Sequence, residues 1–248
     1  TDRGSAVDFF TIEDKGGKIH ISGNEGLSLT TGLNYYYKNY LNVHISEQTM
    51  QVKMPAQLVP VGNKIRKETE FSVRYAYNYC TLSYTFAFFD EEDWQRENDW
   101  LALNGVNVVL DLAGQEATWI LFLMNYGYSF DDAKDWICGP AYSAWQFMSN
   151  METFGGPVSD QYVVDRVELA RSTQRWKNSL GMQTILQGYA GMVPTNFKEF
   201  YPEATLVDQG TWNGVSRPSM IATDSALYDE LAAKFYECQE YVYGKNNH

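Results

Sequence analysis

The stretch RYAYNYCTLSYTFAFFDEEDWQRENDWLALNGVNVVLDLAGQE, residues 74–116, decides the fold class of this chain. The β-forming residues 73–79 predict a first strand. The acidic residues 90–93 stand where the positive end of a helix dipole favours negative charge, and that helix is expected to stop at residues 104–105. The apolar run 106–112 predicts a strand buried on both faces, so the stretch indicates a βαβ unit of an α/β fold.

Both predicted strands run into side chains suited to ligand binding. Asn78, Cys80 and Tyr84 follow the first strand, in what we expect to be an aromatic loop, and Gln115 and Glu116 follow the second. In parallel α/β folds, binding residues gather at the carboxyl ends of the strands. The stretch therefore predicts a binding site at this end of the sheet.

Composition excludes several classes of partner. The formal net charge is −12, from 19 basic and 31 acidic residues. Because no basic stripe is present to neutralise phosphates, neither a nucleic acid nor an anionic membrane surface is an expected partner. The aromatic fraction is 15%, and several aromatic residues fall in loops rich in Gly and Asn. There they could belong to the core, stack on sugar rings or line a pocket.

Other sequence signals are missing. No apolar run is long enough for a membrane helix, and no signal peptide is recognised at the beginning of the sequence. Three cysteines without CxxC spacing predict neither a disulfide framework nor a zinc site. No nucleotide-binding or metalloprotease motif is present, so we expect no cofactor and no metal.

Residues 1–67 are expected to form a small α+β domain. We expect a helix at residues 25–40, and residues 61–70 read as a polar connection between domains. The expected strands of this domain are residues 18–22, 42–46 and 51–54, of which the last two would pair.

Residues 68–248 are expected to repeat a strand followed by helices. A third strand is expected at residues 182–188. Further helices are expected at residues 116–127, 129–137, 140–148 and 159–180, and from a cap at Thr223 or Asp224 to Gly244. These are the first three or so βα units of a (β/α)8 TIM barrel. Three units cannot close such a barrel, so we expect it to be incomplete in this chain, with more sequence after His248 or a second polypeptide supplying the remainder.

The residue types favour sugar chemistry. With three histidines and none beside a Ser or Cys, a hydrolytic triad is not expected, and Cys80 reads as a pocket-lining thiol. Glycosidases use two carboxylates that flank the scissile bond. Asp111 and Glu116 are the best candidates by position, although barrel-interior pairing or helix capping would explain them equally well.

Six motifs in register identify a family resemblance. They are NYCTLSY (78–84), DWLALNGVNVVL (99–110), GQEATW (114–119), GPAYSAW (139–145), GYAGMVP (188–194) and GTWNG (210–214). Together they strongly resemble the α-N-acetylglucosaminidases of glycoside hydrolase family 89. The resemblance covers nearly the whole chain, and it is weaker over the first domain.

This resemblance implies a small N-terminal domain, a (β/α)8 barrel and a C-terminal helical domain. It implies exo-hydrolysis of terminal α-linked N-acetylglucosamine with retention of configuration, and it makes the remainder of the same enzyme a partner of this chain. Residues that match the family's sugar pocket are Asn78, Cys80, Tyr84, Trp145 and Trp212, with Gln115, Glu116 and Tyr189 in matched motifs at the pocket face.

The resemblance also places the family's two catalytic glutamates beyond His248, so no catalytic residue is expected in this chain and Glu116 is not assigned that role. The 248 residues alone are then expected to be inactive. The alternatives are a carbohydrate-binding or scaffold fragment that keeps the pocket, and an unrelated aromatic-rich α/β protein. The family implies a periplasmic or extracellular location for a bacterial protein and a lysosomal one for a eukaryotic relative.

Overall fold

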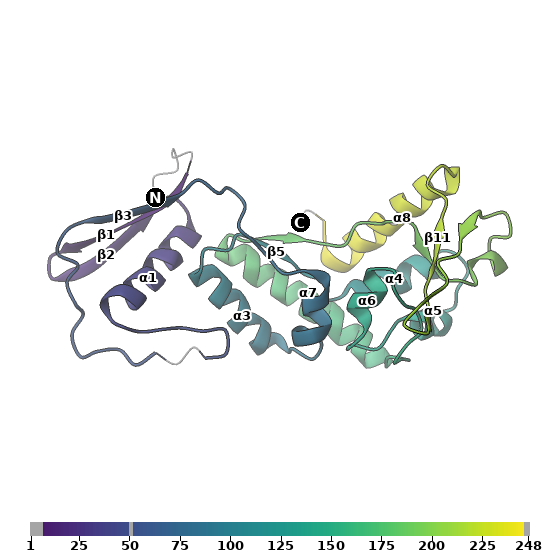
Figure 1. Ribbon diagram of the computed structural model, residues 1–248, viewed down its shortest axis with the longest axis horizontal. Helices are drawn as coiled ribbons and strands as arrows, with labels where there is room; N and C mark the ends of the chain where they lie inside the picture. The colour runs from purple at the N-terminus through teal and green to yellow at the C-terminus, as the bar shows by residue number, and fades with distance from the viewer. Residues whose placement is uncertain (1–6, 50–51, 246–248) are drawn as a thin grey trace. The chain divides into compact units, whose positions relative to one another are not determined.

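The computed structural model describes residues 7–49 and 52–245, which fall into two compact units (Figure 1). The first unit contains the chain up to Ala76 together with residues 91–109 and 173–184. The second contains residues 77–90, 110–172 and those from 185 onward. Each unit is described by itself.

The first unit begins with a three-stranded antiparallel sheet covered by one helix. The strands are β1 (Asp8–Lys15), β2 (Lys18–Gly23) and β3 (Ile65–Thr69), in the order β2-β1-β3, and the helix is α1 (Gly26–Tyr40). Phe10 and Ile12 of β1 pack with Tyr36 of α1 in the core between the sheet and the helix. Gly32 allows this approach, because an added Cβ would lie 2.8 Å from Ile21 Cγ2.

The structure confirms the strand expected at residues 18–22 and the helix expected at residues 25–40, and it corrects the remainder of this region. The expected connection 61–70 contains β3, which pairs with β1 from Ile65 to Thr69. The expected paired strands are wrong for their described residues, where only an isolated bridge between Ser46 and Thr49 occurs. Gln51 lies outside the described residues. The β1 strand had no predicted counterpart, although its turn of two glycines is a known hairpin signal.

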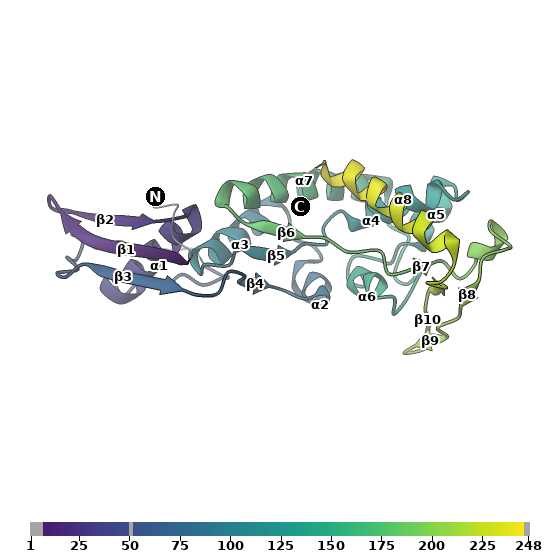
Figure 2. The same cartoon turned by 90° about the horizontal axis from the view of Figure 1, so that it is seen from above.

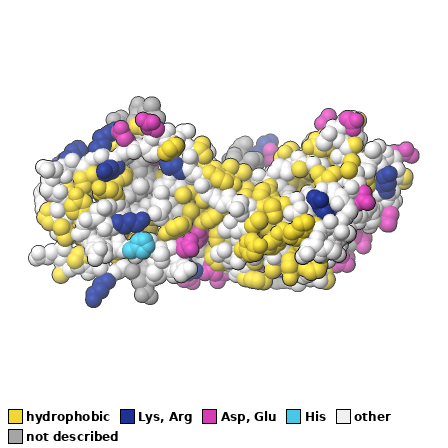
Figure 3. Space-filling view, viewed as in Figure 1, with side chains coloured by type: hydrophobic (Ala, Val, Ile, Leu, Met, Phe, Trp, Pro, Cys, Tyr) yellow, Lys and Arg dark blue, Asp and Glu magenta, His cyan; other side chains and the backbone are white. Residues whose placement is uncertain are grey.

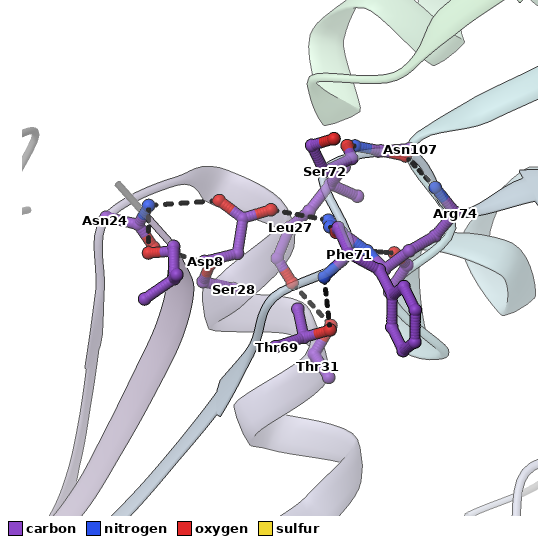
Figure 4. Close-up of polar contacts among 12 residues, drawn as sticks. Asp8, Asn24, Leu27, Ser28, Thr31, Thr69, Phe71, Ser72, Arg74 and Asn107 are labelled. Atoms are coloured by element: carbon purple, nitrogen blue, oxygen red, sulfur yellow. Dashed lines mark hydrogen bonds and ion pairs between the residues drawn. The ribbon is translucent and has the colours of Figure 1, made fainter. Parts of the chain in front are cut away.

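Arg74, directly before strand β4 (Tyr75–Ala76) of the parallel sheet, makes several polar contacts. Figure 4 shows Arg74 pointing toward Asp8 of β1, at a distance of 2.6 Å between Nη2 and Oδ2. Arg74 also donates to the carbonyl oxygens of Phe71 and Gly105, and its backbone N–H donates to Asn107 Oδ1. Residues far apart in the sequence therefore fix the start of the next strand.

The predicted βαβ unit is present. Strand β4 (Tyr75–Ala76), helix α3 (Glu91–Leu103) and strand β5 (Val108–Leu110) follow one another, and β4 pairs with β5 in parallel. A third strand, β6 (Gln183–Ile185), completes the order β4-β5-β6 (Figure 2). Gln183 N donates to Asn107 O and Asp111 N donates to Ile185 O. Residue numbers therefore increase together along β5 and β6, as in a parallel pairing.

The second unit is mainly helical around an aromatic core. Trp119 packs against Trp136 and Phe235, with ring centroids 5.5 and 4.7 Å away. Ser129 and Asp132 form the cap expected for one of its helices. The helices that contribute to this unit are α2 (Tyr79–Thr81), a π-helical turn (Leu82–Phe86), α4 (Gln115–Met124), α5 (Phe130–Trp136), α6 (Ser143–Phe147), α7 (Asp160–Leu180), a 3-10 turn (Phe197–Glu199) and α8 (Ala226–Tyr243).

The long segment between β6 and α8 forms small antiparallel pairings. Strands β7 (Met192–Val193), β8 (Leu206–Val207) and β11 (Ser219–Ile221) have the order β7-β11-β8. Strands β9 (Thr211–Trp212) and β10 (Val215–Ser216) form a hairpin whose turn, Asn213–Gly214, has positive φ at both residues. The turn chemistry therefore places Trp212 at the end of a short hairpin.

Two findings concern the described residues as a whole. Within residues 7–49 and 52–245, no helix is both long and apolar enough to cross a membrane. In that same part of the chain, no three side chains of His, Cys, Asp or Glu converge as a metal site.

Candidate functional site

Asn78 ends the chain segment that leaves β4 and begins the short helix α2. Its Oδ1 accepts hydrogen bonds from the backbone N–H and the hydroxyl of Thr81, both at 3.2 Å. The expected aromatic loop is therefore helical from Tyr79 to Phe86, because Asn78 caps it. The side chain of Asn78 is exposed, and its Nδ2 donors make no hydrogen bond among the described residues. Cys80, two residues on, is a half-buried free thiol.

Tyr84 and Trp145 form an edge-to-face pair. Their ring centroids are 5.1 Å apart with an interplanar angle of 87°. Tyr84 is 77% exposed, and Trp145 is half-buried. Ser83 holds the two segments together, since its hydroxyl donates to Pro140 O and accepts from the Ala144 N–H at 3.0 Å. The structure thus joins two predicted site residues that lie 61 positions apart.

Trp212 lies on the hairpin β9–β10 and is 39% exposed. The hairpin is tied to the segment that follows Trp145. Arg217 Nε donates to Ser149 O at 3.1 Å, and Glu152 N donates to Ser216 O at 3.1 Å. Figure 3 shows hydrophobic side chains exposed on one face of the second unit, and Tyr84 and Trp212 are among the exposed aromatic side chains of this unit. We call Tyr84, Trp145 and Trp212 the exposed aromatic group.

Gln115 and Glu116 occupy a different environment. They begin α4 after Gly114, whose φ of 82° and lack of Cβ are both needed, because a Cβ there would lie 2.7 Å from Ala170 Cβ. Glu116 is 1% exposed, and its Oε1 accepts from Tyr162 OH at 3.2 Å and lies 3.8 Å from Arg166 Nε. Burial lowers the pKa of Arg166, but the neighbouring Glu116, Tyr162, Asp111 and Tyr243 together outweigh that effect and raise the pKa.

Gln115 belongs to the same buried layer. It is fully buried, and its Oε1 lies 3.4 Å from both Gln239 Nε2 and Tyr243 OH. Burial raises the pKa of Tyr162 and of Tyr243, and neighbouring Glu116 adds to both shifts. We call this set the buried polar network; its members are Gln115, Glu116, Tyr162, Arg166, Gln239 and Tyr243. Its contacts hold α4 against α7 and α8.

Tyr189 is likewise not exposed. Its ring packs against Phe122 and Phe235, and the side chain is 7% exposed. Its hydroxyl has no hydrogen-bond partner among the described residues, and burial raises its pKa. The structure therefore divides the eight predicted site residues into two sets. The buried residues are Gln115, Glu116 and Tyr189, and the accessible set is Asn78, Cys80, Tyr84, Trp145 and Trp212.

Neither carboxylate considered from the sequence has the setting of a catalytic acid open to substrate. Asp111 is 2% exposed, and its Oδ1 accepts from the Ala113 N–H at 2.9 Å. Glu116 is committed to Tyr162 and Arg166. Both carboxylates are buried and have structural contacts: Asp111 accepts from the backbone, and Glu116 pairs with Arg166.

Two buried residues that hold the site together were missed by sequence reasoning. Gln187 Oε1 accepts from Trp119 Nε1 at 3.1 Å, while its Nε2 donates to Phe147 O at 2.9 Å. Glu152 binds side chains of three separate segments and is 3% exposed. Nothing in the local sequence marks either residue, because every hydrogen-bond partner of their side chains is at least 16 positions away.

Comparison with known proteins gives concordant matches. The family described as "Alpha-N-acetylglucosaminidase (NAGLU) tim-barrel domain" matches residues 74–248, and the corresponding N-terminal domain matches residues 1–61. Human alpha-N-acetylglucosaminidase is 30% identical over 195 residues, which are 79% of this chain and 26% of that protein.

Solved structures agree. A family 89 glycoside hydrolase from Clostridium perfringens, in complex with 2-acetamido-1,2-dideoxynojirmycin, is 42% identical with a TM-score of 0.92. The match covers 96% of this chain and 28% of that one. A variant of the Clostridium perfringens enzyme with two glutamates changed to glutamine, bound to its substrate GlcNAc-α-1,4-galactose, matches equally well.

This chain thus spans between a quarter and a third of the length of these relatives. The family match covers most of the sequence, and the predicted motifs fall within it. By the fold, the motifs and these matches, the chain belongs to the α-N-acetylglucosaminidases of glycoside hydrolase family 89.

Proposed function

We propose that this chain is part of a retaining exo-glycosidase that releases terminal α-linked N-acetylglucosamine, and that it supplies one wall of the sugar pocket. The observation that carries the proposal is the accessible set around Asn78 and the exposed aromatic group, within a chain of this family. The related Clostridium perfringens enzyme has GlcNAc-α-1,4-galactose as its substrate.

The accessible residues have suitable chemistry for this task. The Nδ2 group of Asn78 would donate to a sugar oxygen, while its Oδ1 stays with Thr81. The rings of Tyr84, Trp145 and Trp212 would cover apolar faces of the sugar and exclude water from the site. Cys80 would line the same wall. Gln115, Glu116 and Tyr189 would act from behind it, by supporting the helices.

The two catalytic glutamates would come from sequence outside these 248 residues, which makes the remainder of the enzyme a partner of this chain. The burial of Asp111 and Glu116 supports this division. In a retaining glycosidase the two carboxyl groups stand about 5–5.5 Å apart, so both would have to face the wall described above. The family favours a periplasmic or extracellular location for a bacterial protein and a lysosomal one for a eukaryotic protein.

A second function, sugar binding without hydrolysis, is favoured by the same separation of aromatics from carboxylates. The accessible rings are suited to hold a sugar, whereas the two carboxylates considered for catalysis, Asp111 and Glu116, are buried. The two proposals differ in whether sequence outside these residues is needed for turnover.

The deciding experiment measures p-nitrophenol release from p-nitrophenyl α-N-acetylglucosaminide. The 248-residue chain is assayed beside the same chain followed by the downstream sequence of its own gene. Turnover by the longer chain alone, with the α-anomer as the first product seen by proton NMR, supports the proposal. Turnover by the short chain would return Asp111 and Glu116 as candidates, and binding without turnover in both would favour the second function.

A further inference from the structure

Glu152 is a buried carboxylate that no sequence motif marks. It is 3% exposed and is not one of the predicted site residues. Four hydrogen bonds converge on its two oxygens. Oε2 accepts from Trp136 Nε1 at 2.7 Å and from the Thr195 N–H at 3.3 Å. Oε1 accepts from Thr195 Oγ1 at 2.6 Å and from Ser216 Oγ at 3.2 Å.

These donors belong to three separate segments. Trp136 ends helix α5, Thr195 follows strand β7, and Ser216 lies on β10, the partner strand of Trp212 (Figure 2). The backbone of Glu152 adds a direct contact, because its N–H donates to Ser216 O at 3.1 Å. One side chain therefore connects the hairpin to two other parts of the second unit.

Glu152 also lies close in sequence to Trp145, another member of the exposed aromatic group. Asn150 N donates to Trp145 O at 2.9 Å, which closes the turn that leads from α6 to Glu152. On the hairpin side, Arg217 Nε donates to Ser149 O at 3.1 Å. The segment 149–152 thus connects the backbone of Trp145 to the strand that pairs with Trp212.

We propose that Glu152 is a positioning residue for the sugar site: its carboxylate fixes hairpin β9–β10, and with it Trp212, against the segment that follows Trp145. This inference rests on the proposed function, because it assigns a purpose to the placement of Trp212. Glu152 acts through Trp212 and makes no contact with the sugar.

The hydrogen-bond pattern shows which substitution should be tolerated. Oε2 receives two N–H groups, which can only donate, whereas Oε1 receives two hydroxyls, which can also accept. A glutamine with its carbonyl oxygen at the Oε2 position and its NH2 group toward the hydroxyls would keep the network. Glu152→Gln therefore preserves the geometry without the charge, whereas Glu152→Ala removes the connection.

The first test is hydrogen exchange by mass spectrometry on the 248-residue chain. In Glu152→Ala we expect the amides of residues 208–217 to exchange about ten-fold faster or more, because the hairpin loses its anchor. Glu152→Gln should exchange like the unchanged chain. The matched control is Glu199→Ala, since Glu199 lines the same hollow of about 380 Å³ as Glu152 but is exposed. Equal exchange in Glu152→Ala and the control would overturn the proposal.

A milder variant covers the case in which Glu152→Ala does not fold. Ser216→Ala removes only the exposed hydroxyl that joins the hairpin to Glu152 Oε1. We expect faster exchange in residues 208–217 in this variant too, by a smaller factor. Unchanged exchange in a folded Ser216→Ala chain, together with a Glu152→Ala chain that does not fold, would show a general stabilising role and would overturn the positioning role.

The second test is a double-mutant cycle in the longer, active chain. Glu152→Ala should lower kcat/KM by about ten-fold, Glu152→Gln should stay within about two-fold, and Glu152→Ala should have little further effect in a Trp212→Ala background. Additive losses, or a loss in Glu152→Gln equal to that in Glu152→Ala, would mean that Glu152 acts by another route.

The two tests separate the inference from the function on which it rests. If the hairpin loosens in Glu152→Ala but Trp212→Ala leaves kcat/KM unchanged, the sugar-pocket assignment of Trp212 fails, and the positioning role in catalysis fails with it, while the structural connection stands. If Trp212→Ala lowers kcat/KM but Glu152→Ala neither loosens the hairpin nor lowers kcat/KM, the sugar pocket stands and the inference about Glu152 fails.

Discussion

The exposed aromatic group and the buried polar network each include residues that follow a strand, Tyr84 in the first and Gln115 and Glu116 in the second, yet their environments are opposite. Tyr84 is 77% exposed, whereas Glu116 is 1% exposed and bound to Tyr162 and Arg166. Position in the strand-to-helix connection therefore does not decide whether a side chain meets a ligand or supports the fold. The difference is set by the elements that cover each connection: α7 and α8 pack over the start of α4, whereas Tyr84 shares its surface with Trp145.

The comparison predicts that substitutions in the network affect stability, whereas those in the aromatic group affect activity. The largest effect is expected for Arg166→Met, which leaves the Glu116 carboxylate buried without its cation. We expect the free energy of unfolding of the 248-residue chain to fall by about 3–5 kcal/mol, measured by urea denaturation. The double variant Arg166→Met with Glu116→Leu should recover much of the loss. A fall below about 1 kcal/mol in the single variant would contradict the importance of the pair.

Gly114→Ala tests the turn that aims Gln115 and Glu116 into the interior. The added Cβ meets Ala170 Cβ at 2.7 Å, and φ is +82°, so we expect a loss of about 1–3 kcal/mol in the free energy of unfolding. The matched control is Gly210→Ala, because Gly210 has φ +68° but nothing within 4 Å of its added Cβ. The difference between the two variants measures the crowding alone, and equal losses would show that crowding contributes nothing.

Trp212→Ala should have the opposite profile. We expect kcat/KM of the longer, active chain to fall by ten-fold or more, equivalent to about 1.4 kcal/mol of transition-state stabilisation. The free energy of unfolding should stay within about 0.5 kcal/mol, because Trp212 is 39% exposed. Tyr241→Ala, which removes an aromatic side chain 73% exposed on α8, is the control and should leave kcat/KM unchanged. Similar kinetics for the two variants would remove Trp212 from the site.

Asn78→Asp separates capping from sugar binding. The carboxylate keeps the oxygen that accepts from Thr81, but it loses the Nδ2 donors. We expect kcat/KM to fall by a factor equivalent to about 1 kcal/mol of lost transition-state stabilisation, or slightly more. The stability measured by thermal denaturation should be unchanged. Asn78→Ala would lose both functions and should also unfold earlier. Wild-type kinetics in Asn78→Asp would mean that the Nδ2 group is not a ligand donor.

The smallest effect is expected from chemical modification of the cysteine thiols, which does not change the fold. Burial raises the pKa of Cys238 to about 11 and, together with the nearby Glu152 charge, that of Cys138 to about 12. At pH 8 only about one in a thousand Cys238 thiols or fewer would be ionised, so both should react slowly with iodoacetamide. Cys80 is half-buried in the proposed sugar wall and should be modified first.

The same thiols give a pH dependence with a defined sign. Because their folded-state pKa values lie above the ordinary value of 9, the folded state holds these protons more tightly than the unfolded chain. Their contribution to stability is complete below pH 9 and is lost as the pH rises toward 11 and 12.

Peptide mapping after alkylation at pH 8 checks the order in which the three cysteines are modified. Alkylation of Cys138 before Cys80 would contradict the burial described above.

Much of the fold followed from local sequence. The acidic residues before Trp94, the apolar run after Gly105 and the Ser129–Asp132 cap each placed an element within a few residues of its observed bounds. Strand β3 was not predicted, because it is polar and is a strand only by pairing with β1. The strands expected at residues 42–46 and 51–54 did not form in their described residues, since β-forming composition without a partner strand does not hold an extended pair.

The sequence alone determined the α/β class, the family, and which residues follow the strands. Only the tertiary structure decided which of those residues are accessible: Glu116 finds Arg166 50 positions later, Tyr84 finds Trp145, and Glu152 connects to the hairpin of Trp212. The physical reason is that helix and strand signals arise between neighbours a few residues apart, whereas burial and ion pairing depend on segments that meet only after the chain has folded.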